Sequence, residues 1–322
     1  MSRVQDIQQR PKASGNQVIS NIRLQKSRRF KQNIPLLIMF IPVLLFYGIF
    51  KYLPMGGLVI AFKNYNFADG ILGSPWVGFK YFQMLFVGSN TVNIIKNTFI
   101  LSLLRIIFGF PAPIILAILL NEVRKTWFKK SVQTIIYMPH FFSWVIIGGV
   151  VVSIFSQETG IVNHFVKMVS GQPYPFMYKS QSWIAIFIGS GIWKEAGFGT
   201  IIYMAALTSI DTSLYEAAVI DGANKWKQIW HITLPGIKPT IVTLFVLSTG
   251  SIMEVGFDQV FMLQNSVVAS VADVISTYIY RVGLQGAQFS ITTAMGLFES
   301  LVGLVLVLVS NWIARRFGES LW

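Results

Sequence analysis

Long apolar runs separated by short polar segments dominate the hydrophobic pattern of this chain. A helix needs about 20 mostly apolar residues to cross the hydrocarbon core of a bilayer. Six segments reach that length, at residues 34–53, 97–120, 135–155, 183–209, roughly 238–262 and roughly 290–314. The pattern therefore predicts an all-α membrane protein with six transmembrane helices.

Two of these segments carry irregularities. Gly109, Pro111 and Pro113 predict a kink in the second segment, and Lys194 and Glu195 interrupt the fourth. Residues 54–94 mix turn residues with aromatics, which favours an interfacial loop with an amphipathic piece near residues 77–86.

Composition agrees with a bilayer-embedded protein. Hydrophobic residues make up 53% of the 322 positions, and charged residues 12%, against about 25% in soluble domains. The net charge of +13 does not indicate a nucleic-acid binder, because little polar surface is left to hold it; basic residues flanking membrane spans explain it better. The absence of cysteine excludes disulfides and thiolate metal sites, and the three histidines share no metal-ligand spacing.

Basic residues also predict orientation. Residues 1–33 are polar and basic and lack a signal-peptide pattern, so we expect a cytosolic tail followed by a transmembrane domain over 34–322. With the N-terminus inside, the cytosolic segments hold 17 Lys and Arg and the outside segments hold 5. This asymmetry predicts that both termini are cytosolic.

The polar stretch from Glu216 to Pro235 then lies in the cytosol, within a loop at 210–236. The S-x-x-E spacing of Ser213–Glu216 predicts a capping box at a helix start. Asp221-Gly222 predicts its end, and we expect a second short helix that Pro235-Gly236 stops before the fifth span. On the residues alone, an amphipathic connector lying on the bilayer is an equally good interpretation.

The spacing of this stretch resembles a known motif. The order E-A-A, G, I-x-L-P resembles the EAA loop of integral-membrane subunits of binding-protein-dependent ABC importers, and it is met at Glu216, Ala217, Ala218, Gly222, Ile232, Leu234 and Pro235. From about residue 30 onward, stretches such as "YLPMGGLVIAFKNYN" and "IWKEAGFGTIIYMAAL" resemble the polysaccharide-type permeases of the carbohydrate-uptake branch.

The resemblance implies a type I ABC importer permease in a bacterial cytoplasmic membrane. Its coupling helix would dock in a groove of a cytosolic ATPase, using the EAA-loop positions above together with Asp221. Nothing in the chain resembles G-x-x-x-x-G-K-[ST], so ATP and Mg²⁺ would bind to partner subunits and this chain would be non-catalytic, without a cofactor. The expected partners are a second similar permease in a heterodimer, two ATPase subunits and an extracellular substrate-binding protein.

Ionisable residues inside spans mark candidate substrate-path positions. Glu254 and Asp258 are four apart and would share a helix face. Aromatic faces could stack on sugars, and Arg281 could attract a uronate carboxylate. The full set is Trp193, Lys194, Glu195, Tyr203, Glu254, Phe257, Asp258, Tyr278, Arg281 and Glu299.

Structural alternatives remain open for each of these positions. Lys194 or Arg105 could form an inter-span salt bridge with Glu299 or Glu254, and Arg281 could pair with Asp273. The aromatics could face lipid or the core, and we expect His140 to be a packing histidine.

Three functions are therefore compared: a permease for oligosaccharides released from polysaccharides, an ion-coupled secondary transporter, and a membrane-embedded enzyme. Intramembrane carboxylates motivate the second, but no internal repeat supports it. The third lacks a catalytic constellation. The basic charge favours acidic cargo only weakly, since most of it is assigned to the cytosol.

Overall fold

The computed structural model describes residues 33–316, and within that range every regular element is helical, with one isolated bridge between Lys63 and Trp76. The chain divides into two compact units, Met1–Val59 and Ile60–Trp322. The predicted tail at residues 1–33 lies, apart from Asn33, outside the described residues.

Helix fills the described part of the first unit. A candidate span runs over Asn33–Phe62, beyond the end of that unit, and contains the predicted segment 34–53. Its regular turns give way to a π-helical turn, η1 (Gly48–Tyr52), then to α2 (Leu53–Met55) and the 3₁₀ helix η2 (Gly56–Phe62).

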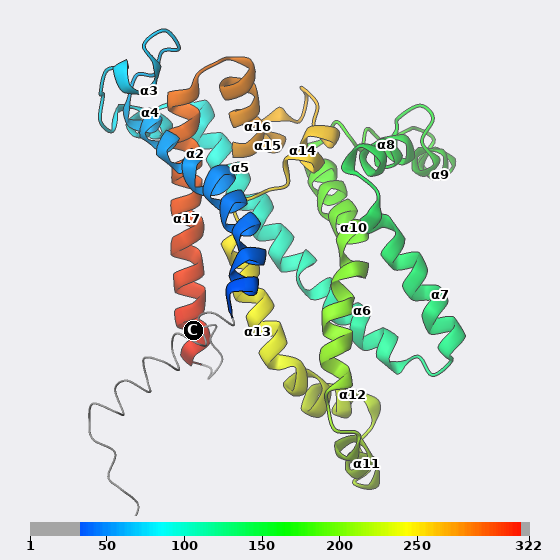
Figure 1. Cartoon of the computed structure of the whole chain (residues 1–322). Coiled ribbons are helices and arrows are strands. Elements are labelled where there is room, and N and C mark those ends of the chain that lie inside the picture. Colours follow the sequence, from blue (N-terminus) through cyan, green and yellow to red (C-terminus); the bar gives the residue numbers. More distant parts are fainter. Residues whose placement is uncertain (1–32, 317–322) are drawn as a thin grey trace, which may run out of the picture. The chain divides into compact units, whose positions relative to one another are not determined.

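Four long helices form the frame of the second unit, as Figure 1 illustrates. One runs over Ser89–Glu122 and comprises α5 (Ser89–Leu104), η3 (Arg105–Gly109) and α6 (Pro111–Glu122). The others are α10 (Ser180–Thr208), a helix over Lys225–Gly250, and α17 (Phe289–Arg316). Shorter helices are α3 (Gly70–Gly73), α4 (Lys80–Val87), α9 (Ile161–Ser170), α15 (Ala269–Ala272), α16 (Ile275–Tyr278) and the π-helical η6 (Ile279–Gln285).

Among residues 33–316, four helices are long and apolar enough to cross a membrane, or five if one bent pair counts as a span. The helix α10 covers the predicted fourth span but is not one of them, because Lys194 and Glu195 lower its hydropathy. The all-α membrane architecture is thus confirmed, while the full count of six stays a prediction.

The predicted third span is not one helix. Residues 135–155 fall on α7 (Thr126–Tyr137), the 3₁₀ turn η4 (Met138–Phe141) and α8 (Trp144–Phe155), with a bend of 105°. The backbone is extended at Phe142 and Ser143, directly after a turn that contains Pro139. Apolar content alone did not reveal this break.

Each π-helical turn in the long helices comes just before a proline. The turns η1 and η3 end at Tyr52 and Gly109, ahead of Pro54 and Pro111. Proline lacks an amide N–H and its ring clashes with the carbonyl four residues earlier. A π-helical turn lets the helix continue through this defect. The second span accordingly runs as one helix over Ser89–Glu122, and its predicted kink stays a prediction.

The segment before the fifth span follows the same rule and corrects two predictions. The helix Lys225–Gly250 comprises α12 (Lys225–Gln228), η5 (Ile229–Thr233) and α13 (Leu234–Gly250), so Pro235-Gly236 does not stop it. It ends instead at Gly250, and α14 starts only at Phe257–Leu263. Glu254 lies in the non-helical break and Asp258 in the first turn of α14, so they do not share one helix face.

The helix α10 passes through the centre of the second unit. Near its start, Trp183 and Phe187 belong to one buried cluster; near its end, Tyr203 and Leu207 belong to another. Between them the backbone of Gly197 lies against α7, because an added Cβ would be 1.9 Å from the carbonyl oxygen of Ile136. This contact fixes α7 against α10 beside the cavity described below.

Candidate functional site

The helix α11 (Thr212–Ile220) is the first part of the segment predicted to be a coupling loop. It begins near Ser213, as predicted, but its cap is Asp211, which accepts a hydrogen bond of 2.9 Å from the Ser213 amide. The capping box from Ser213 to Glu216 was therefore the wrong cap. The hydrogen bonds from Ser213 hold the pKa of Asp211 below its ordinary value of 3.8.

The turn at Asp221-Gly222 confirms the predicted end of α11. Gly222 has a φ of +73°, where an L side chain is strained. The Ala223 amide donates to the Ala218 carbonyl at 2.8 Å, and the Gly222 amide donates to the Val219 carbonyl at 3.0 Å. These two bonds form a Schellman motif, which gives the chain reversal one defined geometry.

Polar contacts tie this turn to the next long helix. Asn224 caps it by accepting from the Lys227 amide at 3.0 Å, and the buried Gln228 donates to the Ala223 carbonyl at 3.1 Å. Tyr215 of α11 and Thr233 of η5 join their hydroxyls at 3.0 Å. The helix α11 is thus fixed to Lys225–Gly250 at two points.

The segment also contacts the end of α6 and the buried core. Lys225 pairs with Glu122 at 2.8 Å. Leu234 packs against a buried cluster that includes Ile237, and an added Cβ at Gly236 would be 2.7 Å from the side chain of Ile210. The helix that holds α11 therefore contacts the end of α6 and a buried cluster formed by residues of α6, α10 and α13.

Most of the remaining predicted coupling residues face outward. Glu216, Ala217, Asp221 and Gly222 are exposed, as is Pro235, while Ala218 and Ile232 are half-buried. Val219 and Ile220 expose 63% and 86% of their surface. Figure 1 shows α11 and α12 at the end of α10 opposite to α8 and α14. The result is a braced, protruding helix with an acidic and apolar surface.

A cavity of about 870 Å³ lies between α5–α6, α10, the break after α13, η6 and α17. Four predicted substrate-path residues line it: Glu195, Glu254, Phe257 and Glu299. Small-molecule sites in proteins commonly have volumes of about 300–1,000 Å³, so this cavity could hold a few sugar units.

The other predicted path residues lie outside the lining. Tyr203 and Tyr278 are buried in two separate apolar clusters. Trp193 and Asp258 are exposed on other surfaces. Residues two apart on a helix point in different directions. Glu195 of α10 therefore lines the cavity while Trp193 does not.

Lys194 is 6% exposed, and its ammonium donates to the His140 carbonyl at 2.8 Å. That carbonyl is at the broken end of η4, so the lysine satisfies an acceptor that the helix break leaves open. Glu195 lies 2.8 Å from Nδ1 of His140 and 3.4 Å from Lys194. The alternative of a bridge from Lys194 to Glu299 or Glu254 is not observed, because Lys194 is held in this local cluster instead.

His140 packs as expected. Its ring stacks on Phe198 at 4.0 Å between centroids.

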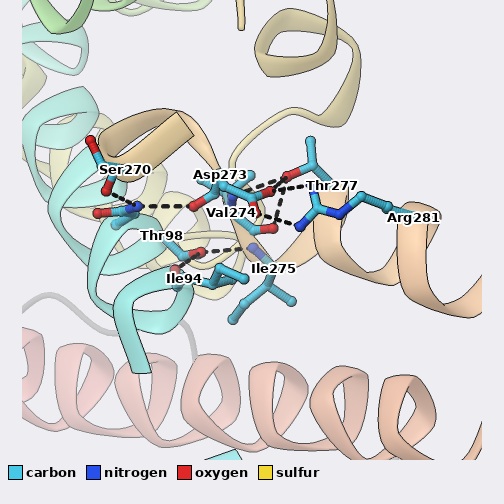
Figure 2. Close-up of polar contacts among 9 residues, drawn as sticks. Ile94, Thr98, Ser270, Asp273, Val274, Ile275, Thr277 and Arg281 are labelled. Carbon is cyan, nitrogen blue, oxygen red and sulfur yellow. Dashed lines mark hydrogen bonds and ion pairs between the residues drawn. The ribbon is translucent and has the colours of Figure 1, made fainter. Parts of the chain in front are cut away.

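The Arg281 side chain is engaged within the chain, which confirms the alternative pairing (Figure 2). Its guanidinium donates to both carboxylate oxygens of Asp273, at 3.2 and 2.5 Å. Thr277 donates to the same carboxylate at 2.8 Å, and Asn97 donates to the Asp273 carbonyl at 3.1 Å. This network holds the segment after α15 against α5.

Arg105 and Ser102 are among the other residues that line the cavity. Arg105 begins the π-helical turn η3, and Ser102 lies one turn before it. The sequence signal for Arg105 was an arginine inside an apolar span; Ser102 gave none, because serine is common in membrane helices. Among the described residues, no three His, Asp or Glu side chains gather as a metal site.

The chain is similar to known transport proteins over most of its length. The family profile described as "Binding-protein-dependent transport system inner membrane component" matches residues 109–321. Protein LplB of Bacillus subtilis is 43% identical over 88% of this chain and 89% of its own length. The polygalacturonan/rhamnogalacturonan transport system permease protein YteP of the same organism is 45% identical over 88% of both chains.

Solved structures agree. A chain in the crystal structure of a bacterial ABC transporter involved in the import of the acidic polysaccharide alginate is similar with a TM-score of 0.84 and 44% identity, covering 91% of this chain and 99% of that one. A second structure is that of a bacterial alginate ABC transporter in complex with an alginate pentasaccharide-bound periplasmic protein, with a TM-score of 0.84 and 44% identity over 91% and 98% of the two chains.

Proposed function

This chain belongs to the family of inner-membrane components of binding-protein-dependent transport systems, and from this premise we propose that its cargo is uronate-containing oligosaccharides. It is a multi-pass inner-membrane permease of an ABC importer, and it is non-catalytic, with ATP hydrolysis in a separate subunit. It works as part of a complex with a binding protein.

Six spans with both termini in the cytosol complete the proposed topology. The 29-residue helix α10 would be about 44 Å long at a rise of 1.5 Å per residue, enough to cross a bilayer. Its charged middle is acceptable in a membrane because Lys194 and Glu195 are paired with each other and with His140. The transmembrane domain would occupy 34–322, after a cytosolic tail at 1–33.

The segment 210–236 is the proposed ATPase-coupling element. The small side chains of Ala217, which is exposed, and Ala218, which is half-buried, permit close approach of another protein, and Glu216 can pair with a basic groove residue. Its bracing to α6, α10 and α13 supports transmission of a push into the membrane helices. Glu216, Ala217, Ala218, Asp221 and Gly222 would contact the ATPase, while Ile232, Leu234 and Pro235 shape the support behind them.

The cavity is the proposed sugar path. Glu195, Glu254 and Glu299 offer acceptors for sugar hydroxyls, and Phe257 offers a stacking face. A second permease subunit would supply the other half of the path, and two ATPase subunits would complete the complex.

One observation carries the choice of cargo: the chain is more than 40% identical, over most of its length, both to a polygalacturonan/rhamnogalacturonan permease and to an alginate importer chain. Polygalacturonan and alginate are both polymers of uronic acids. The chemistry they share is a carboxylate on each sugar unit.

The test is uptake by proteoliposomes that contain the full complex and its binding protein. We expect ATP-dependent uptake of oligogalacturonate or oligoalginate and none of neutral oligosaccharides of equal length. Uptake driven by a proton or sodium gradient without ATP would instead support a secondary transporter. Uptake of neutral sugars alone would overturn the proposed cargo.

A further inference from the structure

The cavity wall contains one cation. Of the residues that line it, only Arg105 is a lysine or arginine. Its guanidinium has no carboxylate within 4.0 Å among the described residues, and its one contact there is a hydrogen bond of 3.5 Å to the Glu254 backbone carbonyl. Most of its five N–H donors are therefore free to bind a ligand.

A buried hydroxyl without a partner lies beside this arginine. Ser102 is 2% exposed and lines the cavity, and its Oγ has no hydrogen-bond partner in the described part of the chain. Residues three apart occupy the same side of a helix, so Ser102 and Arg105 are on one face of the α5–η3 segment. A buried unsatisfied hydroxyl is unusual in a folded protein and calls for an explanation.

The three glutamates that line the cavity differ in whether they form an ion pair. Glu195 is held by His140 and Lys194, so its charge is compensated within the chain. Glu254 and Glu299 have no ion pair among the residues described. They remain available as acceptors for sugar hydroxyls, and Arg105 is left as the group that can receive an anion.

We propose that Arg105, with Ser102 beside it, forms a carboxylate-binding site for the uronate groups of the passing oligosaccharide. This inference rests on the proposed function and names the residues that recognise its acidic cargo. A guanidinium can bind a carboxylate with two parallel hydrogen bonds, and the Ser102 hydroxyl can donate to the same anion or to a neighbouring sugar oxygen. It also assigns to Arg105 the role that the sequence suggested for Arg281, whose guanidinium is held by Asp273.

The proposal is tested with Arg105→Gln and Arg105→Lys in the reconstituted full complex. Glutamine keeps a donor for the Glu254 carbonyl but removes the charge, and lysine keeps the charge but not the two-pronged geometry. We expect uronate uptake to fall roughly 10-fold or more for Arg105→Gln, as for loss of a charge-assisted hydrogen bond, with a smaller fall for Arg105→Lys. Co-purification of the ATPase subunits shows whether each variant assembles, since α11 is untouched.

A second measurement uses the absence of cysteine in this chain. Ser251 lines the cavity, so Ser251→Cys places a thiol there, and the wild-type chain gives the labelling background. We expect oligouronate delivered by the binding protein to slow the reaction of this thiol with an anionic and with a cationic reagent of similar size. Adding Arg105→Gln should lower the rate with the anionic reagent relative to the rate with the cationic one, and an unchanged ratio of the two rates would contradict the site.

The outcomes separate the two claims. If wild-type vesicles take up uronates and Arg105→Gln takes them up equally well, the arginine site is wrong while the cargo stands. If the wild type takes up only neutral sugars, both are wrong. If Arg105→Gln does not assemble, protection of the thiol in the otherwise wild-type chain decides: equal slowing by galacturonate and by galactose at the same concentration would overturn the site.

Discussion

The proposed coupling segment, residues 210–236, and the cavity wall are built in different ways. Residues 210–236 are close in sequence, and their geometry comes from local hydrogen bonds such as the Schellman turn at Gly222. The cavity wall joins α5, α10, α17 and the break after α13, so its geometry comes from tertiary packing and from interrupted helices. A local motif can be recognised by spacing, whereas a packed wall needs the fold.

The strongest test of this contrast is at the packed wall. Gly197→Ala would place a methyl group 1.9 Å from the Ile136 carbonyl oxygen, so we expect a stability loss of roughly 2 kcal/mol or more. Gly189→Ala on the same helix has no atom within 4 Å of its Cβ and should be neutral or slightly stabilising. Thermal unfolding of the purified complex measures both; equal midpoints would contradict the close packing of α7 on α10.

A smaller effect is expected beside the wall, where an ion pair and its hydrogen bonds hold the segment after α15 against α5. Arg281→Gln leaves Asp273, whose side chain is 11% exposed, without its charged partner, and we expect a loss of about 2 kcal/mol. Its uptake preference for uronates should be unchanged, unlike that of Arg105→Gln. If Arg281→Gln shifted the uptake preference toward neutral sugars, Arg281 would lie on the substrate path.

In the proposed coupling segment, substitution of Gly222 distinguishes an effect on stability from an effect on ATPase coupling. Gly222→Ala and Gly171→Ala both place alanine at a positive φ with open space around the Cβ, and each should cost about 1 kcal/mol. Only Gly222→Ala should also lower ATPase activity stimulated by loaded binding protein. An equal decrease in both variants would mean that the turn matters only for stability.

The smallest effect concerns the cap of α11. The pKa of Asp211 is lowered by hydrogen bonds from Ser213, so its stabilising contribution is full above the ordinary value of 3.8 and is lost as pH falls through the lower folded value. Asn caps equally well without titrating. The thermal midpoint of wild type relative to Asp211→Asn should therefore fall on acidification; parallel curves would contradict the role of the carboxylate.

The features that the sequence predicted correctly are those whose geometry depends on neighbouring residues. The positive φ at Gly222 and the helix start near Ser213 follow from turn and capping chemistry within a few residues. The effect of a proline on its helix was predicted wrongly, because that effect depends on tertiary packing. A π-helical turn lets the helix continue through Pro235, whereas the helix breaks at Phe142 and Ser143, after Pro139.

Intramembrane charges show the same limit. Residue type alone could not say that Lys194 serves a broken helix end, that Arg281 is held by Asp273, or that Arg105 faces a cavity. Each outcome depends on which segment packs opposite the charge. The spacing of residues along the chain does not reveal which segment that is.

The most direct test of the account is ATPase activity of the reconstituted complex, stimulated by loaded binding protein, when this chain carries both Glu216→Lys and Gly222→Pro. Glu158→Lys with Gly171→Pro is the matched control, because it reverses an exposed charge and strains another glycine of positive φ beside α9. For the first pair we expect an ATPase rate at the unstimulated level and reduced co-purification of the ATPase, and for the control pair near-normal stimulation. Full stimulation in the first pair would contradict coupling through α11.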